Sequence, residues 1–518
     1  MKLRYFIGGL AGCLLLFTAS CSLNYEPLDA YSDVTEGVSD GDTKEAAFKD
    51  KAAVVSHRRT MYNQMRDRQE HWYLDLLLVA EAHSDNAYAG TVGAEVVPYE
   101  DNSIEGSNSV IDRDWKRYME DVARANKLIC NIDLVADNTL TATEREEYKA
   151  EAKIFRAMVY FDMVRLWGAI PVITTEAEDI VSETISEVYE QYFPPQNTEM
   201  EAYQLIETDL LEALEHAPDN NAADKTLFTK SVARTLLAKV YAEKPLRDYA
   251  KVIKYCDDVA KDGFGLVADF SDLFGVTLKD NTIPASQTNV AVDAKMRNTK
   301  ESILEAQFPV GSGNWCTWMY GRNLANWNDN FTWAKWITPS RDLIKAYQDE
   351  GDMTRANESI VYYACGWSIY YPSDNYPFMY KCRSALSSII KFRYADVLLL
   401  KAEALIMRDA PDLTGAAAII DQIRERAGLP KLSPAAKANK ESMLNALLKE
   451  RRLELAFEGQ RWFDLVRLNK VEEVLNAVYA KDSGKKAQVY PFNENSYKLP
   501  IPQAVMDQNP RLVQNAGY

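Results

Sequence analysis

The sequence of 518 residues predicts a mostly α-helical protein, with a body of helical hairpins and a loop-rich, aromatic-rich subdomain. Apolar residues recur at helical spacing from about residue 44 to 262, and again from residue 388 to about 480. Between these stretches, residues 269–387 contain prolines, glycines, asparagines and aromatic residues without a sustained period. A segment of this length inside a compact protein predicts a functional region.

The composition indicates a large folded core and an acidic surface. Hydrophobic residues make up 47% and charged residues 26% of the chain, with only 22 Gly and 19 Pro, which excludes a disordered or collagen-like protein. The 76 acidic residues outnumber the 59 basic residues, for a net charge of −17. Such a field repels phosphate backbones, so we expect no nucleic-acid partner.

The first residues are typical of a bacterial lipoprotein signal. Lys2 and Arg4 precede an apolar run over residues 7–17, and small residues then lead to Cys21. The run of 11 residues is shorter than the roughly 20 that a membrane-spanning helix needs. We therefore expect residues 1–20 to be removed and Cys21 to carry the lipid anchor, including palmitate. Ordinary secretion, with Cys21 as a bystander, remains the alternative.

The helical part contains an internal repeat. Residues 230–262 predict two helices separated by Lys244-Pro245, and the pattern recurs 164 positions later. The pairs related by this shift include Leu236 and Leu400, Ala238 and Ala402, Tyr241 and Leu405, Cys256 and Ile420, Asp257 and Asp421, and Val259 and Ile423. This two-helix unit resembles the tetratricopeptide (TPR) repeat. An irregular helical domain with chance self-similarity is the alternative.

One predicted helix, over residues 443–466, carries charges on its apolar stripe. The spacing of its leucines and tryptophan places Arg451 and Glu458 on the buried face. Because an isolated buried ion costs several kcal/mol, roughly, partners are required. The candidates are Arg156, Arg165 and Arg393. We expect a structural ion network with Arg461 and Asp464, and the alternative is that Glu458 is a catalytic acid.

Common catalytic and metal-binding motifs are absent from the sequence. It contains no phosphate-binding loop, dinucleotide fingerprint, Gly-x-Ser-x-Gly elbow or His-Glu-x-x-His. His71 and Asp75 have i, i+4 spacing, which is more typical of surface pairing than of a metal site. A disulfide between Cys365 and Cys382 is left open. We expect no cofactor, no metal and no enzyme activity, although the sequence does not exclude a carboxylate pair of the glycoside hydrolase type.

Aromatic residues gather in one part of the loop-rich region. Five of the ten tryptophans, Trp315, Trp318, Trp327, Trp333 and Trp336, lie among asparagines and glycines that disfavour a helix interior. Such rings can stack on sugar faces while amides and Arg322 bind the hydroxyl groups. We expect Trp336 to pack on the body instead. The predicted ligand-binding residues here are Trp315, Trp318, Tyr320, Arg322, Trp327 and Trp333.

Four stretches from one end of the chain to the other are similar to the SusD/RagB family of Bacteroidetes outer-membrane lipoproteins. They are FRAMVYFDMVRLWGAIP at 155–171, FRYADVLLLKAEAL at 392–405, ERRLELAFEGQRWFDLVR at 450–467, and LPIP at 499–502 with QNAGY at 514–518. The resemblance implies a TPR-containing body, a loop-rich subdomain and no catalysis. It also implies glycan capture for a SusC-like TonB-dependent transporter, and a site lined in part by the region of Tyr88 and Tyr99.

The expected protein is therefore a glycan-binding lipoprotein anchored in the outer membrane and facing the exterior. Its acidic charge favours neutral or amino-sugar glycans over polyanions. A peptide-binding member of the same family, a helical glycoside hydrolase and a TPR adaptor remain alternatives. The expected organisation is a signal over residues 1–20, a tether over 21–43, a TPR-like helical region over 44–268, a ligand-binding insertion over 269–387, a C-terminal helical region over 388–480 and a tail packing on the body over 481–518.

Overall fold

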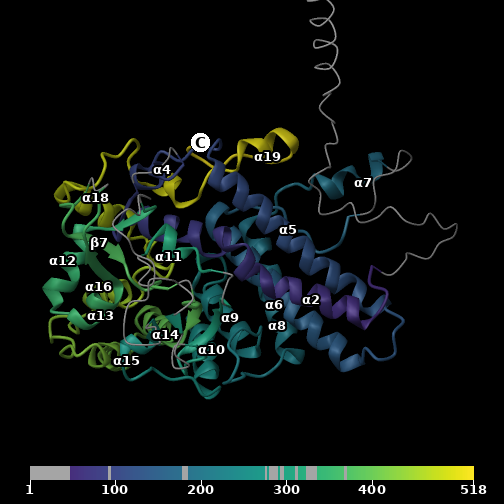
Figure 1. Cartoon of the computed structure of the whole chain (residues 1–518), viewed down its shortest axis with the longest axis horizontal. Coiled ribbons are helices and arrows are strands. Elements are labelled where there is room, and N and C mark those ends of the chain that lie inside the picture. The colour runs from purple at the N-terminus through teal and green to yellow at the C-terminus, as the bar shows by residue number, and fades with distance from the viewer. Residues whose placement is uncertain are drawn as a thin grey trace, which may run out of the picture. The chain divides into compact units, whose positions relative to one another are not determined.

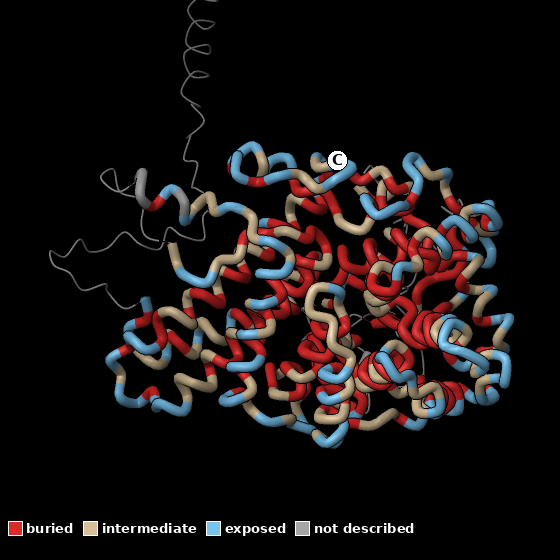
Figure 2. Tube along the Cα trace, turned by 180° about the vertical axis from the view of Figure 1, so that it is seen from behind, coloured by how far each residue is buried: buried red, intermediate tan, exposed pale blue. Residues whose placement is uncertain are grey.

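The computed structural model describes most of the chain after residue 46. The described residues are 47–90, 95–177, 185–274, 277–278, 290–291, 297–309, 313–321, 335–366, 370–384 and 386–518. They form a mostly α-helical protein with a few short strands, as predicted (Figure 1). Buried segments run along the central helices, and exposed segments follow the outer loops (Figure 2). None of the described helices is long and apolar enough to cross a membrane.

The first half of the protein is built from helices. These are α2 (Lys51–Asp67), α3 (Asp75–Leu77), α4 (Val97–Asp101), α5 (Ser109–Asn131), α6 (Ala142–Trp167), α7 (Ile185–Tyr192), α8 (Glu199–His216), α9 (Lys230–Ala242) and α10 (Tyr249–Lys261). Helix α6 begins with a capping box, in which Thr141 and Glu144 satisfy each other's backbone N–H groups. It packs against both α5 and α8, and buried residues lie on all its faces. This helix is therefore the centre of the N-terminal core.

The middle of the chain contains short helices and paired strands. The helices are α11 (Cys316–Met319), α12 (Arg341–Glu350) and α13 (Met353–Ser359). The antiparallel pairs are β1 (Ala87–Ala89) with β5 (Ile337–Pro339), β2 (Thr277–Leu278) with β3 (Val290–Ala291), β4 (Ser302–Ala306) with β8 (Ile389–Arg393), and β6 (Ile360–Tyr363) with β7 (Tyr376–Met379). The loop-rich region thus contains regular structure in pieces too short to show a sequence period.

The C-terminal part returns to helices. These are α14 (Tyr394–Met407), α15 (Leu413–Arg426), α16 (Lys440–Glu454), α17 (Arg461–Arg467), α18 (Val471–Lys481) and α19 (Gln503–Gln508). The tail after α18 lies against the end of α6. Leu499 N donates to Leu166 O at 2.7 Å, and the Trp167 indole donates to Pro500 O at 3.1 Å. Two of the stretches that carry the family resemblance therefore contact each other.

The predicted repeat is confirmed down to its turns. In the α9–α10 hairpin, Asp248 N donates to Tyr241 O at 2.9 Å, and the Asp248 carboxylate caps α10. In the α14–α15 hairpin, Asp412 N donates to Leu405 O at 2.8 Å, and the Asp412 carboxylate caps α15. Both pairs of positions differ by 164. Helices α10 and α14 pack against each other, so the two hairpins are neighbours.

The predicted single helix over residues 443–466 is wrong. Helix α16 ends at Glu454, and α17 begins at Arg461. Between them Phe457 and Gly459 have φ angles of 62° and 74°, in the left-handed region that breaks a right-handed helix. The apolar stripe continues through this turn, which is why its spacing resembled one helix.

Candidate ligand-binding site

The described part of the aromatic segment, residues 313–321, is held on the body by side-chain amides. Gln69 is buried and clamps the entry to α11: its Nε2 donates to Gly313 O at 3.0 Å, and its Oε1 accepts from Trp315 N at 2.8 Å. Asn314 accepts from Cys316 N at 2.9 Å and donates to Ser387 O at 2.8 Å. Because these polar contacts fix the backbone where the segment enters α11, its side chains can take up a defined arrangement.

Two of the predicted tryptophans are exposed together. Trp315 is the N-cap of α11 and Trp318 lies three residues later, with 42% and 48% of their surfaces accessible. Trp315 has helical backbone angles, so the i, i+3 spacing places both indole rings on the same side of this short helix. Exposed tryptophans one turn apart form an apolar surface suited to flat ligand faces.

The neighbouring residues Lys335 and Trp336 bind the backbone of α11. Trp336 N donates to Met319 O at 2.9 Å, and its half-buried ring lies edge-on to Tyr320. The prediction that Trp336 packs on the body is confirmed. The Lys335 ammonium, which is buried, donates to Trp318 O.

Three of the predicted ligand residues lie in the interior instead. Tyr320, Tyr88 and Tyr99 are at most 1% exposed. The Tyr320 hydroxyl donates to Leu74 O, and that of Tyr88 donates to Asp482 at 2.7 Å. The hydroxyl groups of Tyr320 and Tyr88 thus have protein partners, as those of buried tyrosines usually do. The predicted Arg322, Trp327, Trp333 and Cys21 lie outside the described residues.

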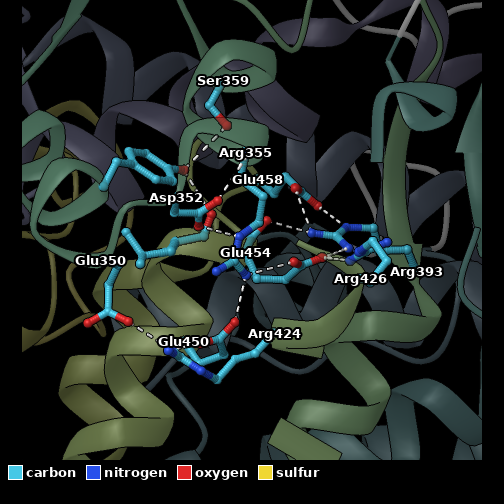
Figure 3. Close-up of polar contacts among 12 residues, drawn as sticks. Glu350, Asp352, Arg355, Ser359, Arg393, Arg424, Arg426, Glu450, Glu454 and Glu458 are labelled. Atoms are coloured by element: carbon cyan, nitrogen blue, oxygen red, sulfur yellow. Dashed lines mark hydrogen bonds and ion pairs between the residues drawn. The ribbon is translucent and has the colours of Figure 1, made fainter. Parts of the chain in front are cut away.

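Glu458 belongs to a network of ion pairs, but most of its members differ from the predicted ones (Figure 3). Glu458 lies in the turn after α16 and accepts from Arg393 at 2.6 and 2.9 Å. It also accepts from the buried Lys381. Of the three predicted partners only Arg393 contacts it, because Arg156 pairs with Asp209 and Arg165 pairs with Asp162.

Glu454 is the centre of this network. It contacts Arg393 at 2.6 Å and Arg355 of α13 at 3.0 Å, and it also pairs with Arg426. Burial alone would raise the pKa of Glu454, but the three guanidinium groups outweigh it and hold the pKa well below its usual value. Glu454 and Glu458 are both held by buried cations, so the geometry supports a structural role for them.

Arg451, His71 and Asp75 are also buried. Arg451 pairs with Asp464 and Asp396, each at 2.8 Å, so this charge on the apolar stripe has the partners that its burial requires.

The expectation of surface pairing between His71 and Asp75 is wrong, since both are at most 2% exposed. His71 contacts Asp121 at 2.8 Å, because residues 70–74 form a π-helical turn in which α-helical spacing does not hold. Within the described ranges, no group of three or more His, Cys, Asp or Glu residues could hold a metal ion.

Comparisons with known proteins extend over most of the chain. A family model described as "SusD family" matches residues 366–518, and one described as "Starch-binding associating with outer membrane" matches residues 37–242. SusD-like protein P2 of Formosa agariphila is 27% identical over 510 residues, covering 92% of this chain and 94% of that protein. SusD-like protein P38 of the same organism is 25% identical, covering 80% and 82%.

Solved structures share the fold. A structure titled "Laminarin binding SusD-like protein" superposes with a TM-score of 0.66 at 23% identity, covering 91% of this chain and 100% of that one. Surface glycan-binding protein A from Bacteroides fluxus gives a TM-score of 0.70 at 21% identity, covering 90% and 99%.

Proposed function

The chain belongs to the SusD/RagB family, and from this premise we propose that it is a cell-surface lipoprotein that captures oligosaccharides and delivers them to a SusC-like TonB-dependent transporter. One family model is described as starch-binding and associated with the outer membrane, and the two solved structures named above are titled as binding proteins. Anchoring through Cys21 and exposure to the exterior are parts of the proposal, supported by the signal-like N-terminus.

The main evidence for a ligand site is the exposed pair Trp315 and Trp318. Their i, i+3 spacing puts them on one side of α11, and Gln69 and Asn314 hold that segment in place. An ordered aromatic surface binds a flat sugar face with little loss of side-chain entropy. We assign these two tryptophans as the stacking residues for a neutral or amino-sugar glycan, because the net charge of −17 opposes polyanions.

The experiment is binding of purified protein, lacking residues 1–20, to a panel of neutral, amino-sugar and acidic polysaccharides and of peptides. Retention of a glycan without cleavage supports the proposal. Cleavage would indicate a glycoside hydrolase, retention of peptides alone would indicate a peptide-binding member of the family, and no retention of either would contradict glycan capture.

The tryptophans are tested by calorimetry with the retained glycan. Trp315→Ala and Trp318→Ala should each weaken binding by about 1–3 kcal/mol, the range for aromatic stacking on flat rings. Tyr490→Ala is the matched control, because Tyr490 is 58% exposed in the C-terminal tail and should leave the affinity unchanged. Circular dichroism confirms that the variants fold. Parental affinity in both tryptophan variants would place the site elsewhere.

A further inference from the structure

Two cysteines from distant parts of the sequence lie together, one of them in the aromatic segment. Cys316 opens α11, and Cys382 follows β7. Both are buried, and both are in the thiol form in the structure. Cys382 is close enough to Cys316 to act on its thiol group. Asn314 contacts both residues, since its Oδ1 accepts from Cys316 N at 2.9 Å and its Nδ2 lies 4.0 Å from Cys382 Sγ.

The backbones on both sides of this pair are also in contact. Gly321 forms a parallel β-bridge with Met379, and a Cβ atom at Gly321 would lie only 2.4 Å from Cys382 O. On the other side, the Thr317 hydroxyl donates to Ser384 O at 3.0 Å. The two chain segments are therefore held close on both sides of Cys382, and such closeness is a precondition of a disulfide.

We propose that Cys316 and Cys382 form a disulfide in the exported protein, and that this bond fixes the Trp315–Trp318 surface onto the segment that follows β7. The inference rests on the proposed function, because only an exported chain meets an oxidising compartment. The two thiols lose two protons and two electrons as the S–S bond forms. A protein disulfide oxidoreductase accepts them by exchange, and its own disulfide becomes a dithiol.

The buried position determines when the bond forms. Burial, and then the hydrogen bond to the Cys382 thiol, raise the pKa of the Cys316 thiol well above its usual value. Because the thiolate is the form that attacks a disulfide, exchange on the folded protein is slow. The bond therefore forms while the chain is folding, and once formed it is shielded from external reductants.

The pairing differs from the one left open by the sequence. Cys365 packs with Tyr376 and Phe378 in a separate apolar cluster, whereas Cys316 and Cys382 belong to the main core. Spacing along the chain could not make this distinction, because residues 365 and 382 are closer in sequence than 316 and 382.

A peptide map tests the pairing directly. Protein from cells that export it is unfolded in N-ethylmaleimide and digested with trypsin, which cuts after Lys381 and so separates Cys365 from Cys382. We expect peptide 301–322 joined to the dipeptide 382–383, with loss of the joined species on reduction. N-ethylmaleimide on both Cys316 and Cys382, or a link between Cys382 and Cys365, would overturn the proposal.

Thermal unfolding provides an independent readout. A reductant added during unfolding should lower the Tm of the parent to that of the double variant Cys316→Ser/Cys382→Ser, and should leave that variant unchanged. Cys365→Ser is the control and should remain as sensitive to reductant as the parent. A parental Tm that does not respond to reductant would contradict the bond.

The experiments test glycan capture and the disulfide independently of each other. The peptide map needs no ligand, so a joined peptide from a protein that retains no glycan contradicts glycan capture alone. Glycan retention by a protein with both thiols alkylated contradicts the disulfide alone.

Discussion

At the scale of single residues, Glu458 shows how much one side chain can depend on its charged partners. Its carboxylate is shared between Arg393 and Lys381, whose side chains are at most 3% exposed. Removing one member of a buried ion network leaves the others without compensation, which costs more than the pair itself contributes.

Glu458→Ala should therefore lower the free energy of unfolding by about 3–5 kcal/mol in urea denaturation. Glu473→Ala is the matched control, because Glu473 pairs with Lys470 at the surface and is 63% exposed, so the change should be below about 1 kcal/mol. Loss of glycan binding at parental stability would instead assign Glu458 to the ligand site.

Residue patterns predicted burial better than they predicted partners. The apolar stripe located Arg451 on a buried face correctly, because the period of an element is local information, but it placed Glu458 on a helix where the structure has a turn. It could not give Asp396 as a partner of Arg451, since that pair joins α14 to α16. For the same reason, composition did not distinguish the exposed Trp315 from the buried Tyr320 five residues later.

At the scale of elements, the turn between α16 and α17 allows Glu458 to contact its partners. Gly459 has a left-handed φ of 74°, and its N–H donates to Glu81 at 3.2 Å. No atom lies within 4 Å of a Cβ built at Gly459, so a side chain there would meet only backbone strain.

Gly459→Ala should cost about 1–2 kcal/mol, the strain of an L-residue in this conformation. Gly366→Ala is the comparison, because that site is equally open but has an ordinary φ, and its stability should stay within about 0.5 kcal/mol of the parent. The readout is the urea midpoint at constant m-value. Equal midpoints for the two variants would show that the turn is not strained by a side chain.

The elements whose ends carry local signals were the ones that the sequence predicted well. Both hairpins of the repeat have an aspartate N-cap after their turn, so periodicity and boundaries agreed. The strands of the loop-rich region have two to five residues and obtain their stability from partners far along the chain, as β4 does from β8. Such pairing leaves no periodic signal in a short window.

At the scale of the whole molecule, Asp85 connects an early part of the chain to the C-terminal helices α16 and α17. It accepts from Arg461 at 2.8 Å through both carboxylate oxygens and lies 3.2 Å from Arg452. Burial would raise the pKa of Asp85, but the charges of the two arginines outweigh burial and lower it. In unfolded chains this carboxyl binds protons more readily, so its contribution to stability is present above about pH 4 and is lost as the pH falls below that value.

Asp85→Asn should therefore be less stable than the parent by about 3–5 kcal/mol at pH 7, and the difference should shrink as the pH falls below about 4.

Glu81→Gln should show the opposite dependence on pH. Burial raises the pKa of Glu81 to about 7, so the stability of the parent relative to this variant should fall as the pH rises from about 4.5 to 7. Urea denaturation at a series of pH values measures both, and a constant difference for Asp85→Asn would contradict the pairing.

The contact between α10 and α14 also affects the order in which the protein can fold. The Lys401 ammonium of α14 pairs with Asp257 of α10, yet the two helices are separated by residues 262–393. The chain emerges with its N-terminus first, so the first hairpin is available for folding 164 residues before the second. Until the second hairpin arrives, the side of α10 that faces α14 is uncovered, so a holding chaperone has a defined segment to protect.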